Sequence, residues 1–263
     1  MDKAFFISIP HSGEQVPEKT PWLHGLSEPH LMRDVDRFVD VLYQPAIDKL
    51  ELNSIKTQWH RYVTDLNRLP GDIDETAVIG APNKVGTFPI GLHWTKTTQD
   101  EPLITEPMSF ELHQQLLDKY FYPFHEDVKK IYSYYFKQGH KKVYQLDAHS
   151  MPSWGTSAHK DPGKERPEIV ISDFHSVSCE ESYKNLVITA YEKAGFQVGY
   201  NFPYVGGRVT QTYGKPDVGQ HAIQVEMRRN LYMNEETKQL EGQKSKEIQL
   251  KVLEAISHIR KNL

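Results

Sequence analysis

The sequence predicts an α/β fold, with one domain over residues 1–263 built on a mixed, mostly parallel sheet flanked by helices. Short apolar runs of strand length alternate along the chain with longer segments of helical periodicity. Alternation of this kind is typical of a sheet that helices cover on both faces. The composition agrees, because 38% hydrophobic and 25% charged residues are ordinary values for a globular protein with a large core.

The elements can be placed from hydrophobic periodicity. We expect strands at residues 5–9, 52–56, 62–65, 143–147, 169–172, 197–200 and 222–227. Helical patterns fill residues 28–50, 110–138, 180–194 and 236–259. Two stretches lack either period: residues 70–107, which are rich in Pro, Gly and Thr, and residues 153–167, which are polar and contain glycine. We expect both to be loops that leave the core, and loops of that size often line sites.

Charge and composition exclude several classes of protein. A net charge of −4 argues against a dedicated nucleic-acid binder, which would carry a basic surplus. The amino terminus has neither the apolar length nor the cleavage site of a signal peptide, so we expect a cytoplasmic protein without membrane association. The single cysteine, Cys179, cannot form an internal disulfide, and we expect it to be a small buried side chain rather than a nucleophile activated by His175. The sequence specifies no oligomeric state.

Two histidines are candidate metal ligands. His11 follows the expected strand 5–9, and His149 follows the expected strand 143–147, so both would stand where a strand gives way to its loop. Two histidines and one carboxylate are a common ligand set of catalytic zinc. Either Glu14, three residues after His11, or Asp36, turned inward within the expected helix 28–50, can supply that carboxylate.

Candidate substrate-binding and catalytic groups lie in three further segments. Arg68 beside Asn67 offers a planar fork for a substrate carboxylate, although Arg68 can equally pair with a nearby aspartate to fix the turn. Arg208 follows a pair of glycines that permit close backbone approach. Glu226 lies in a buried strand pattern, where desolvation would raise its pKa towards that of a general base, and a salt bridge with Arg229 is the alternative reading.

Six short motifs occur together in a fixed order between residues 10 and 233. They are Pro10-His11-Ser12-Gly13, Asp34-Val35-Asp36, Asp65-Leu66-Asn67-Arg68, Asp147-Ala148-His149-Ser150-Met151-Pro152-Ser153, Pro203-Tyr204-Val205-Gly206-Gly207 and Gln224-Val225-Glu226-Met227-Arg228-Arg229-Asn230-Leu231-Tyr232-Met233. Together they resemble the N-formylglutamate amidohydrolase family. The resemblance covers most of the chain and is far more specific than any single motif.

The resemblance implies hydrolysis of an N-acyl amide on an acidic amino acid, such as N-formylglutamate, on a fold similar to that of zinc carboxypeptidases. It implies about one Zn²⁺ per chain, held by His11, His149 and one carboxylate. Asp36 matches the family motif, whereas the family does not require an acid at Glu14. The similar Asp-x-Asn-Arg segment of related deacylases implies that Arg68 receives a substrate carboxylate.

The expected mechanism assigns the remaining groups. Glu226 carries the proton, and Arg61 or Arg208 stabilises the oxyanion. Arg229 either binds a second substrate carboxylate or orients Glu226. Two other functions stay open: a peptidase or amidase acting on a peptide or cell-wall fragment, and a small-molecule binding protein that has kept the fold and lost activity.

Overall fold

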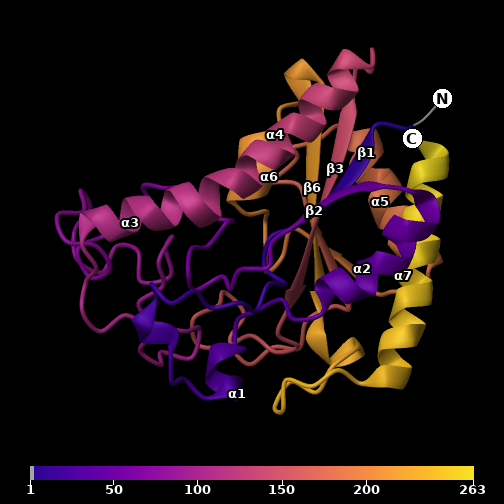
Figure 1. Cartoon of the computed structure of the whole chain (residues 1–263). Coiled ribbons are helices and arrows are strands. Elements are labelled where there is room, and N and C mark those ends of the chain that lie inside the picture. The colour runs from indigo at the N-terminus through magenta and orange to yellow at the C-terminus, as the bar shows by residue number, and fades with distance from the viewer. Residues whose placement is uncertain (1–2) are drawn as a thin grey trace.

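A six-stranded mixed sheet forms the centre of the computed structural model, which describes residues 3–263 (Figure 1). The strand order is β2-β1-β3-β6-β4-β5. The strands are β1 (Phe5–Ile9), β2 (Asn53–Lys56), β3 (Val143–Met151), β4 (Ile169–Ser172), β5 (Val198–Tyr200) and β6 (Gln220–Arg228). The pairs among β2, β1, β3 and β6 are parallel, whereas β4 and β5 run in the opposite direction, which confirms the predicted mixed, mostly parallel sheet.

Helices cover both faces of this sheet. They are α1 (Glu28–Leu31), α2 (Val39–Leu50), α3 (Phe110–Leu116), α4 (Tyr122–Lys137), α5 (Glu181–Lys193), α6 (Arg208–Tyr213) and α7 (Gly242–Asn262). Helices α2, α5 and α7 pack together on one face, and α4 and α6 contact the other (Figure 1). None of the helices within residues 3–263 has an apolar stretch long enough to cross a bilayer.

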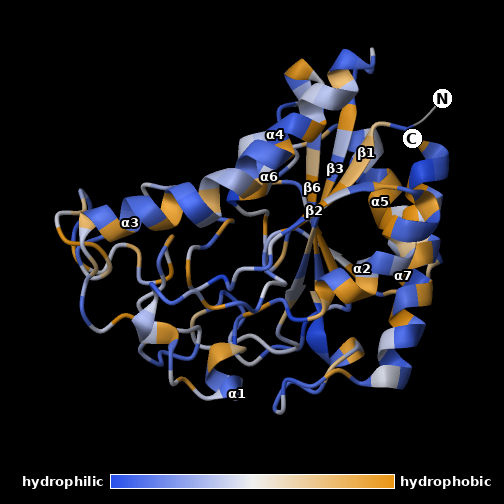
Figure 2. Cartoon of the chain, viewed as in Figure 1, coloured by the Kyte–Doolittle hydropathy of each residue, from blue (hydrophilic) through white to orange (hydrophobic). Residues whose placement is uncertain are grey.

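The two faces of the sheet differ in polarity at its centre. In β3, Leu146 and Ala148 point into the core beneath α2, α5 and α7, and the intervening residues point to the opposite face. Apolar residues are concentrated along the strands and on α2 and α5 (Figure 2). The opposite face carries the buried polar residues Gln145, Asp147 and His149 of β3. Such a polar face inside a protein is a candidate for a functional site.

The structure corrects several expected boundaries. Strands β3 and β6 are longer than the expected runs 143–147 and 222–227, so His149 lies inside a strand and not after its end. The expected strand 62–65 is wrong, because the Val63 amide donates to His60 O in a turn. The expected helix 28–50 is two helices, and Asp36 lies in the irregular segment between α1 and α2.

The carboxyl-terminal part of the chain also differs from expectation, whereas the middle segment agrees with it. The last helix begins at Gly242 and not at residue 236, and the short helix α6 was not predicted. The pattern over residues 110–138 is helical as expected, with a π-helical stretch, Leu117–Phe121, between α3 and α4. The unbroken helical backbone there agrees with the continuous apolar periodicity of the sequence.

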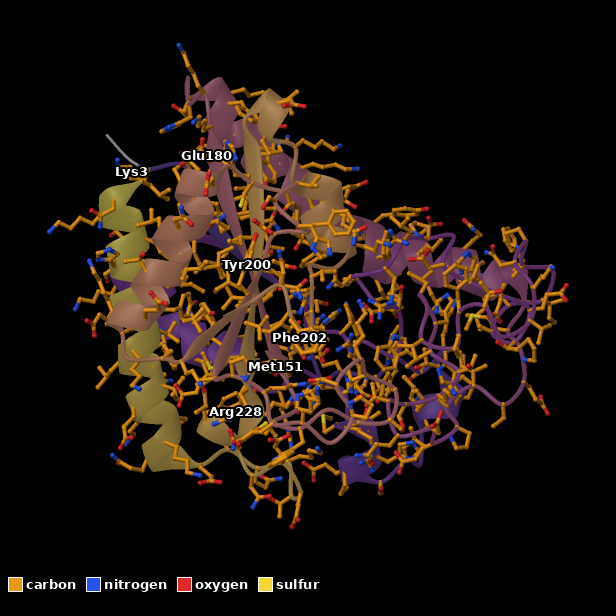
Figure 3. All side chains as sticks on the ribbon, turned by 180° about the vertical axis from the view of Figure 1, so that it is seen from behind. Lys3, Met151, Glu180, Tyr200, Phe202 and Arg228 are labelled. Atoms are coloured by element: carbon orange, nitrogen blue, oxygen red, sulfur yellow. The ribbon has the colours of Figure 1, made fainter. Side chains whose placement is uncertain are left out.

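Residues 152–168 form a loop that we call the arm. It leaves β3 after Met151, which pairs with Arg228, and it enters β4 at Ile169, which pairs with Met227. Figure 3 shows Met151 and Arg228 close together at the ends of β3 and β6. Because β4 runs antiparallel to β6, both ends of the arm lie beside the carboxyl-terminal end of β6.

Candidate metal and catalytic site

His149 and Glu226 lie side by side on neighbouring strands. They are register partners of the parallel pair β3 and β6, so their side chains project from the same face of the sheet. His11 follows β1, the strand on the other side of β3. Asp36 joins them because its amide donates to His11 O at 3.0 Å, which holds the segment between α1 and α2 against the end of β1.

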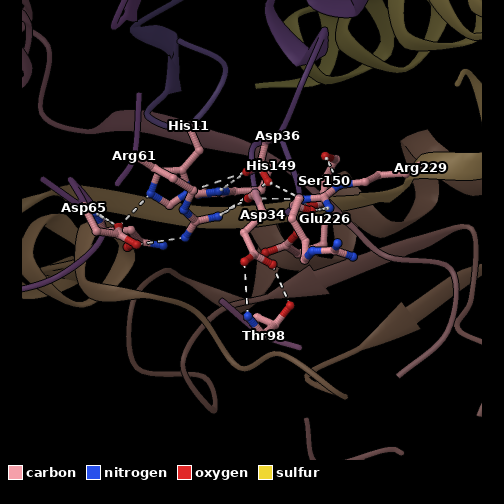
Figure 4. A network of polar contacts seen from close by, with 12 residues as sticks. His11, Asp34, Asp36, Arg61, Asp65, Thr98, His149, Ser150, Glu226 and Arg229 are labelled. Atoms are coloured by element: carbon pink, nitrogen blue, oxygen red, sulfur yellow. Dashed lines mark hydrogen bonds and ion pairs between the residues drawn. The ribbon is translucent and has the colours of Figure 1, made fainter. Parts of the chain in front are cut away.

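His11, Asp36 and His149 bring three ligand atoms together. Asp36 Oδ2 is 3.0 Å from His149 Nδ1 and 3.5 Å from His11 Nδ1, and the potential ligand atoms of the group lie within 4.8 Å of one another (Figure 4). All three side chains are buried. The buried Nδ1 of His11 has no hydrogen-bond partner among the described residues. Nitrogen and carboxylate ligands arranged in this way fit a zinc ion.

The outer nitrogen of each ring is held by a second carboxylate. His11 Nε2 lies 2.7 Å from Asp65 Oδ1, and His149 Nε2 lies 2.8 Å from Asp147 Oδ2. An ionised carboxylate only accepts hydrogen bonds, so each Nε2 donates to its carboxylate, and with a metal bound each Nδ1 would present its lone pair to the ion. Carboxylates that fix histidine ligands in this way are typical of zinc sites.

A chain of buried hydrogen bonds fixes Asp147 in turn. The Tyr132 hydroxyl on α4 donates to Gln145 Oε1 at 2.9 Å, and Gln145 Nε2 donates to Ser8 Oγ at 2.7 Å. Ser8 Oγ then donates to Asp147 Oδ1 at 2.5 Å. Each hydrogen bond in this series is donated in the direction of Asp147, so the series defines the orientation of each group in it.

The charges of the group favour a cation. Burial raises the pKa of Asp36, but the neighbouring His11 and His149 rings outweigh burial and hold that pKa well below its usual range. Burial also raises the pKa of Asp65, and the opposing charge of Arg61 helps to hold it well below the usual range. Buried ionised carboxylates need positive charge beside them. A divalent ion at the Nδ1 atoms would supply it.

Glu226 is buried beside this group without belonging to it. Its Oε1 accepts a hydrogen bond from Gln224 Nε2 at 2.8 Å, and 6% of the residue is exposed. Burial raises the pKa of Glu226, which suits a group that must take up a proton. The alternative salt bridge with Arg229 does not form, because Arg229 Nη2 donates to Asp36 Oδ1 at 3.1 Å.

A cavity of about 430 Å³ opens above these groups. Most of the predicted site residues line it: His11, Asp36, Arg61, Asn67, Arg68, His149, Glu226 and Arg229. Glu14 and Arg208 are not part of the lining. Glu14 Oε1 lies 2.7 Å from Arg37 Nε, and Arg208 Nε lies 3.3 Å from Asp72 Oδ2. Of the two carboxylates that the sequence left open, Asp36 is therefore the one that meets the histidines.

Comparison with known proteins identifies the family of the chain. The family model of N-formylglutamate amidohydrolase matches residues 3–233. The chain belongs to the N-formylglutamate amidohydrolase family. It is 30% identical over 235 residues to an N-formylglutamate deformylase of Pseudomonas putida, covering 87% of this chain and 81% of the relative. It is 27% identical over 237 residues to an N-formylglutamate deformylase of Pseudomonas aeruginosa, covering 88% and 82% of the two chains.

Solved structures share the fold. An N-formylglutamate amidohydrolase from Ralstonia eutropha superposes with a TM-score of 0.85 at 24% identity, covering 100% of this chain and 96% of the other. A gene product of Agrobacterium tumefaciens gives a TM-score of 0.74 at 18% identity, covering 99% and 91%. The α/β architecture around the cavity is therefore that of the N-formylglutamate amidohydrolase family.

The arginines of this family member differ in how they are engaged. Arg61 donates to Asp65 Oδ2 at 2.8 Å and lies over the Trp94 ring, with 4.6 Å between Cζ and the ring centroid. Among the described residues, Arg68 donates only to carbonyl oxygens, those of Ile90 and Asn67, each at 3.0 Å. The alternative in which Arg68 pairs with a nearby aspartate is therefore not seen. The charge of Arg68 contributes to the lowered pKa of Asp65, but no acidic side chain within residues 3–263 lies at ion-pair distance from Arg68.

Asn67 contributes through packing as well as through its position in the lining. Its Oδ1 accepts the Val209 amide at 2.8 Å, at the start of α6. Gly207 lies so close that a Cβ there would come within 2.4 Å of the Asn67 amide carbon. Glycine is thus required at residue 207 to bring this loop against Asn67.

Several lining residues were not predicted individually. Asp34 accepts hydrogen bonds from Thr98 N at 3.1 Å and Thr98 Oγ1 at 2.6 Å, which ties the long loop 70–107 to the site. His159, Lys160 and Tyr204 line the same cavity. Asp34 and Tyr204 stand in two of the six motifs, whereas only the length and polarity of the two long loops indicated a contribution from Thr98, His159 and Lys160. The periodicity of the sequence carries no information about which loop side chains turn inward.

Cys179 plays no part in this site. It is buried in the core under α5, and burial raises the pKa of its thiol to about 12. A thiol with a raised pKa is a poor nucleophile at neutral pH. This agrees with the expectation of a structural cysteine.

Proposed function

We propose that this protein is a zinc-dependent hydrolase that cleaves the formyl amide of N-formylglutamate, releasing formate and glutamate. The observation that carries the proposal is the convergence of His11 Nδ1, His149 Nδ1 and Asp36 Oδ2 beside the buried Glu226. The family relationship supports the substrate. A cavity of about 430 Å³ also falls in the range typical of sites for one small ligand.

His11, Asp36 and His149 would hold the metal. When bound, a zinc ion supplies Lewis acidity, which makes water a nucleophile at neutral pH and polarises the substrate carbonyl. Asp65 and Asp147 keep the two rings in the tautomer that leaves each Nδ1 unprotonated. Arg229 holds Asp36 from its other oxygen, so the carboxylate keeps its orientation.

Glu226 would move the proton. It accepts a proton from the water that attacks the formyl carbon and passes a proton to the nitrogen of the departing amino acid. Its raised pKa brings it closer to the working pH, as a group that must both accept and release a proton requires. The hydrogen bond from Gln224 directs one of its oxygens and leaves the other for water.

Arg68 and Asn67 would bind a substrate carboxylate. The guanidinium of Arg68 faces no acidic side chain within residues 3–263 at ion-pair distance, and it lines the cavity. Of the two arginines considered for the oxyanion, Arg61 lines the cavity and Arg208 does not, so we assign that role to Arg61.

The test combines metal analysis of the purified protein with a panel of N-acyl amino acids and short peptides. We expect about one zinc per chain and preferential cleavage of N-formylglutamate. Preferential cleavage of peptides would favour the peptidase alternative. Stoichiometric binding of N-formylglutamate without turnover in the zinc-loaded protein would favour a binding protein.

A further inference from the structure

Four cationic side chains, apart from histidines, line the cavity: Arg61, Arg68, Lys160 and Arg229. Two of them are neutralised by carboxylates of the protein. Arg61 Nη2 lies 2.8 Å from Asp65 Oδ2, and Arg229 Nη2 lies 3.1 Å from Asp36 Oδ1. Both guanidinium groups therefore already face acids of the metal-binding group, and they have less charge to offer a substrate carboxylate than a cation with no acidic partner.

Arg68 and Lys160 differ from this pair. Within residues 3–263 no acidic side chain lies at ion-pair distance from either of them. N-formylglutamate, the proposed substrate, carries two carboxylates and no compensating positive charge. Two cations without carboxylate partners therefore match the charge of that molecule. With Arg68 at one carboxylate, Lys160 is the remaining unpaired cation of the lining.

The arm holds Lys160 in place although its side chain is exposed. At the base of the arm, the buried Arg166 donates to both oxygens of Asp161, with distances of 2.8 and 2.9 Å. Further along, Thr156 Oγ1 donates to Thr98 O at 3.0 Å, which fastens the arm to the loop that also contacts Asp34. Lys160 thus lies next to a fixed residue, Asp161, and near the tip of a braced loop.

The backbone of the arm is also folded upon itself. Isolated bridges join Trp154 to Glu165 and Gly155 to Pro162. Gly155 has no room for a side chain, since a Cβ there would lie 2.0 Å from Asp161 O. The turn that carries Ala158, His159 and Lys160 to the cavity is therefore set by backbone contacts before any ligand binds.

We infer that Lys160 binds the second carboxylate of the substrate and makes the enzyme selective for N-acylated dicarboxylic amino acids. This inference rests on the proposed function. A lysine suits the task because its ammonium is a point charge that needs no bidentate geometry, unlike the fork of Arg68. Since Lys160 is exposed, its contribution also depends on ionic strength.

The test uses the zinc-loaded protein and three substrates: N-formylglutamate and its two monoamides, each of which lacks one carboxylate. Lys160→Gln keeps a polar side chain, one atom shorter, and removes its charge. We expect kcat/KM to fall about tenfold for N-formylglutamate and for one monoamide, the range of a charge-assisted hydrogen bond. The other monoamide already lacks the carboxylate that Lys160 binds, so its kcat/KM should stay within about twofold of the wild-type value.

Two variants serve as controls. Lys160→Arg retains the charge and should recover most of the activity towards N-formylglutamate. Lys164→Gln removes a charge from an exposed lysine of the same arm that does not line the cavity, and it should leave all three substrates unaffected. An effect of Lys164→Gln equal to that of Lys160→Gln would overturn the inference, because it would reflect general charge.

The outcomes separate this inference from the proposed function. If the wild-type protein cleaves N-formylglutamate but Lys160→Gln lowers activity equally for all three substrates, or for none, the role of Lys160 is wrong and the proposed function stands. If the zinc-loaded wild-type protein cleaves none of them, the proposed function fails, and this inference fails with it.

Discussion

His149 and Glu226 are register partners on the adjacent parallel strands β3 and β6. The same pairing that builds the centre of the sheet therefore sets the separation of a metal ligand from the proposed proton carrier. Strands position side chains more rigidly than loops do, which suits a site whose geometry must be maintained. The following predictions depend on this division of roles.

Metal binding should depend on the ligands and on the outer carboxylates to different degrees. His149→Ala should remove most of the zinc, because it deletes one of three protein ligands. Asp147→Asn should retain the ligands but weaken zinc affinity by about 10- to 100-fold, since it loosens the outer hold on His149. Competition with a chromogenic chelator measures both effects.

The matched control for metal binding is Asp72→Asn, which removes a carboxylate paired with Arg208 outside the cavity lining. It should leave zinc affinity unchanged. Stoichiometric zinc in the His149→Ala protein would show that the ligand assignment is wrong.

Glu226→Gln should separate proton transfer from metal binding. We expect the variant to keep its zinc and its fold and to lose about 10²- to 10⁴-fold in kcat, the usual cost of removing a general base. Glu14→Gln is the control, because Glu14 pairs with Arg37 outside the cavity. Near-normal turnover of Glu226→Gln, or loss of its zinc, would rule out the role.

Arg68→Lys should impair recognition of a substrate carboxylate while keeping the charge. We expect a loss of about 1–3 kcal/mol in transition-state stabilisation for N-formylglutamate, because the bidentate geometry is lost. Steady-state kinetics with the two monoamides provide the check: one of them should be spared, and it should not be the one that Lys160→Gln spares.

Arg208→Lys is the control for Arg68→Lys, since it makes the same change outside the cavity lining. Its kinetic constants should match those of the wild-type protein. Equal losses on N-formylglutamate and both monoamides in Arg68→Lys would mean that Arg68 serves the fold and does not read the substrate.

Stability should fall in mild acid because histidines are buried in the neutral form. Burial lowers the pKa of His60 to about 4 and that of His93 to about 3. Both values lie below those of the unfolded chain, near 6.5, so the unfolded state takes up protons first as the pH falls. The stabilisation is complete above about pH 6.5 and is lost between that pH and the folded-state pKa values, at about 1.4 kcal/mol per pH unit for each histidine.

Denaturant unfolding of the metal-free protein between about pH 7.5 and 5 measures how the free energy of unfolding depends on pH. This range brackets the pKa of histidine in the unfolded chain, about 6.5. His93→Gln should be less stable at neutral pH, because it disturbs the bonds to Val63 O and His113, and its stability should depend less on pH. His24→Gln, at an exposed position, should retain the wild-type slope. A pH-independent stability of the wild-type protein would contradict the prediction.

The sequence predicted the apolar parts of the sheet more accurately than its functional parts. Strands β1 and β4 match the expected runs residue for residue, because every position there is buried. Strand β3 was expected to stop at Asp147, since the polar residues that follow look like a loop. They are polar because they form the site. Their polarity interrupts the apolar pattern from which the strand would otherwise be predicted.

The sequence predicted most of the residues that form the site, but it did not predict which of them contact one another. The apolar spacing around Asp36 indicated a helix, but the bond to His11 O holds that segment open, and no local pattern encodes a bond between such distant residues. The choice between Asp36 and Glu14, and the use of Arg61 and Arg229 to neutralise acids, also depend on contacts across the fold.

Because β4 runs opposite to β3, the loop that lines the cavity can change during evolution without changing the strands that stabilise the fold. The arm starts after Met151 and ends before Ile169, and both residues lie beside the carboxyl-terminal end of β6. Residues can therefore be inserted or deleted near its tip without moving either strand. A longer or shorter loop between fixed ends changes the closure free energy only slightly, by about 0.6 kcal/mol for each doubling of length. Relatives of this chain could therefore acquire new acyl or amino-acid preferences by remodelling residues 157–160, while the metal-binding group, carried by β3, the end of β1 and the segment before α2, remains untouched.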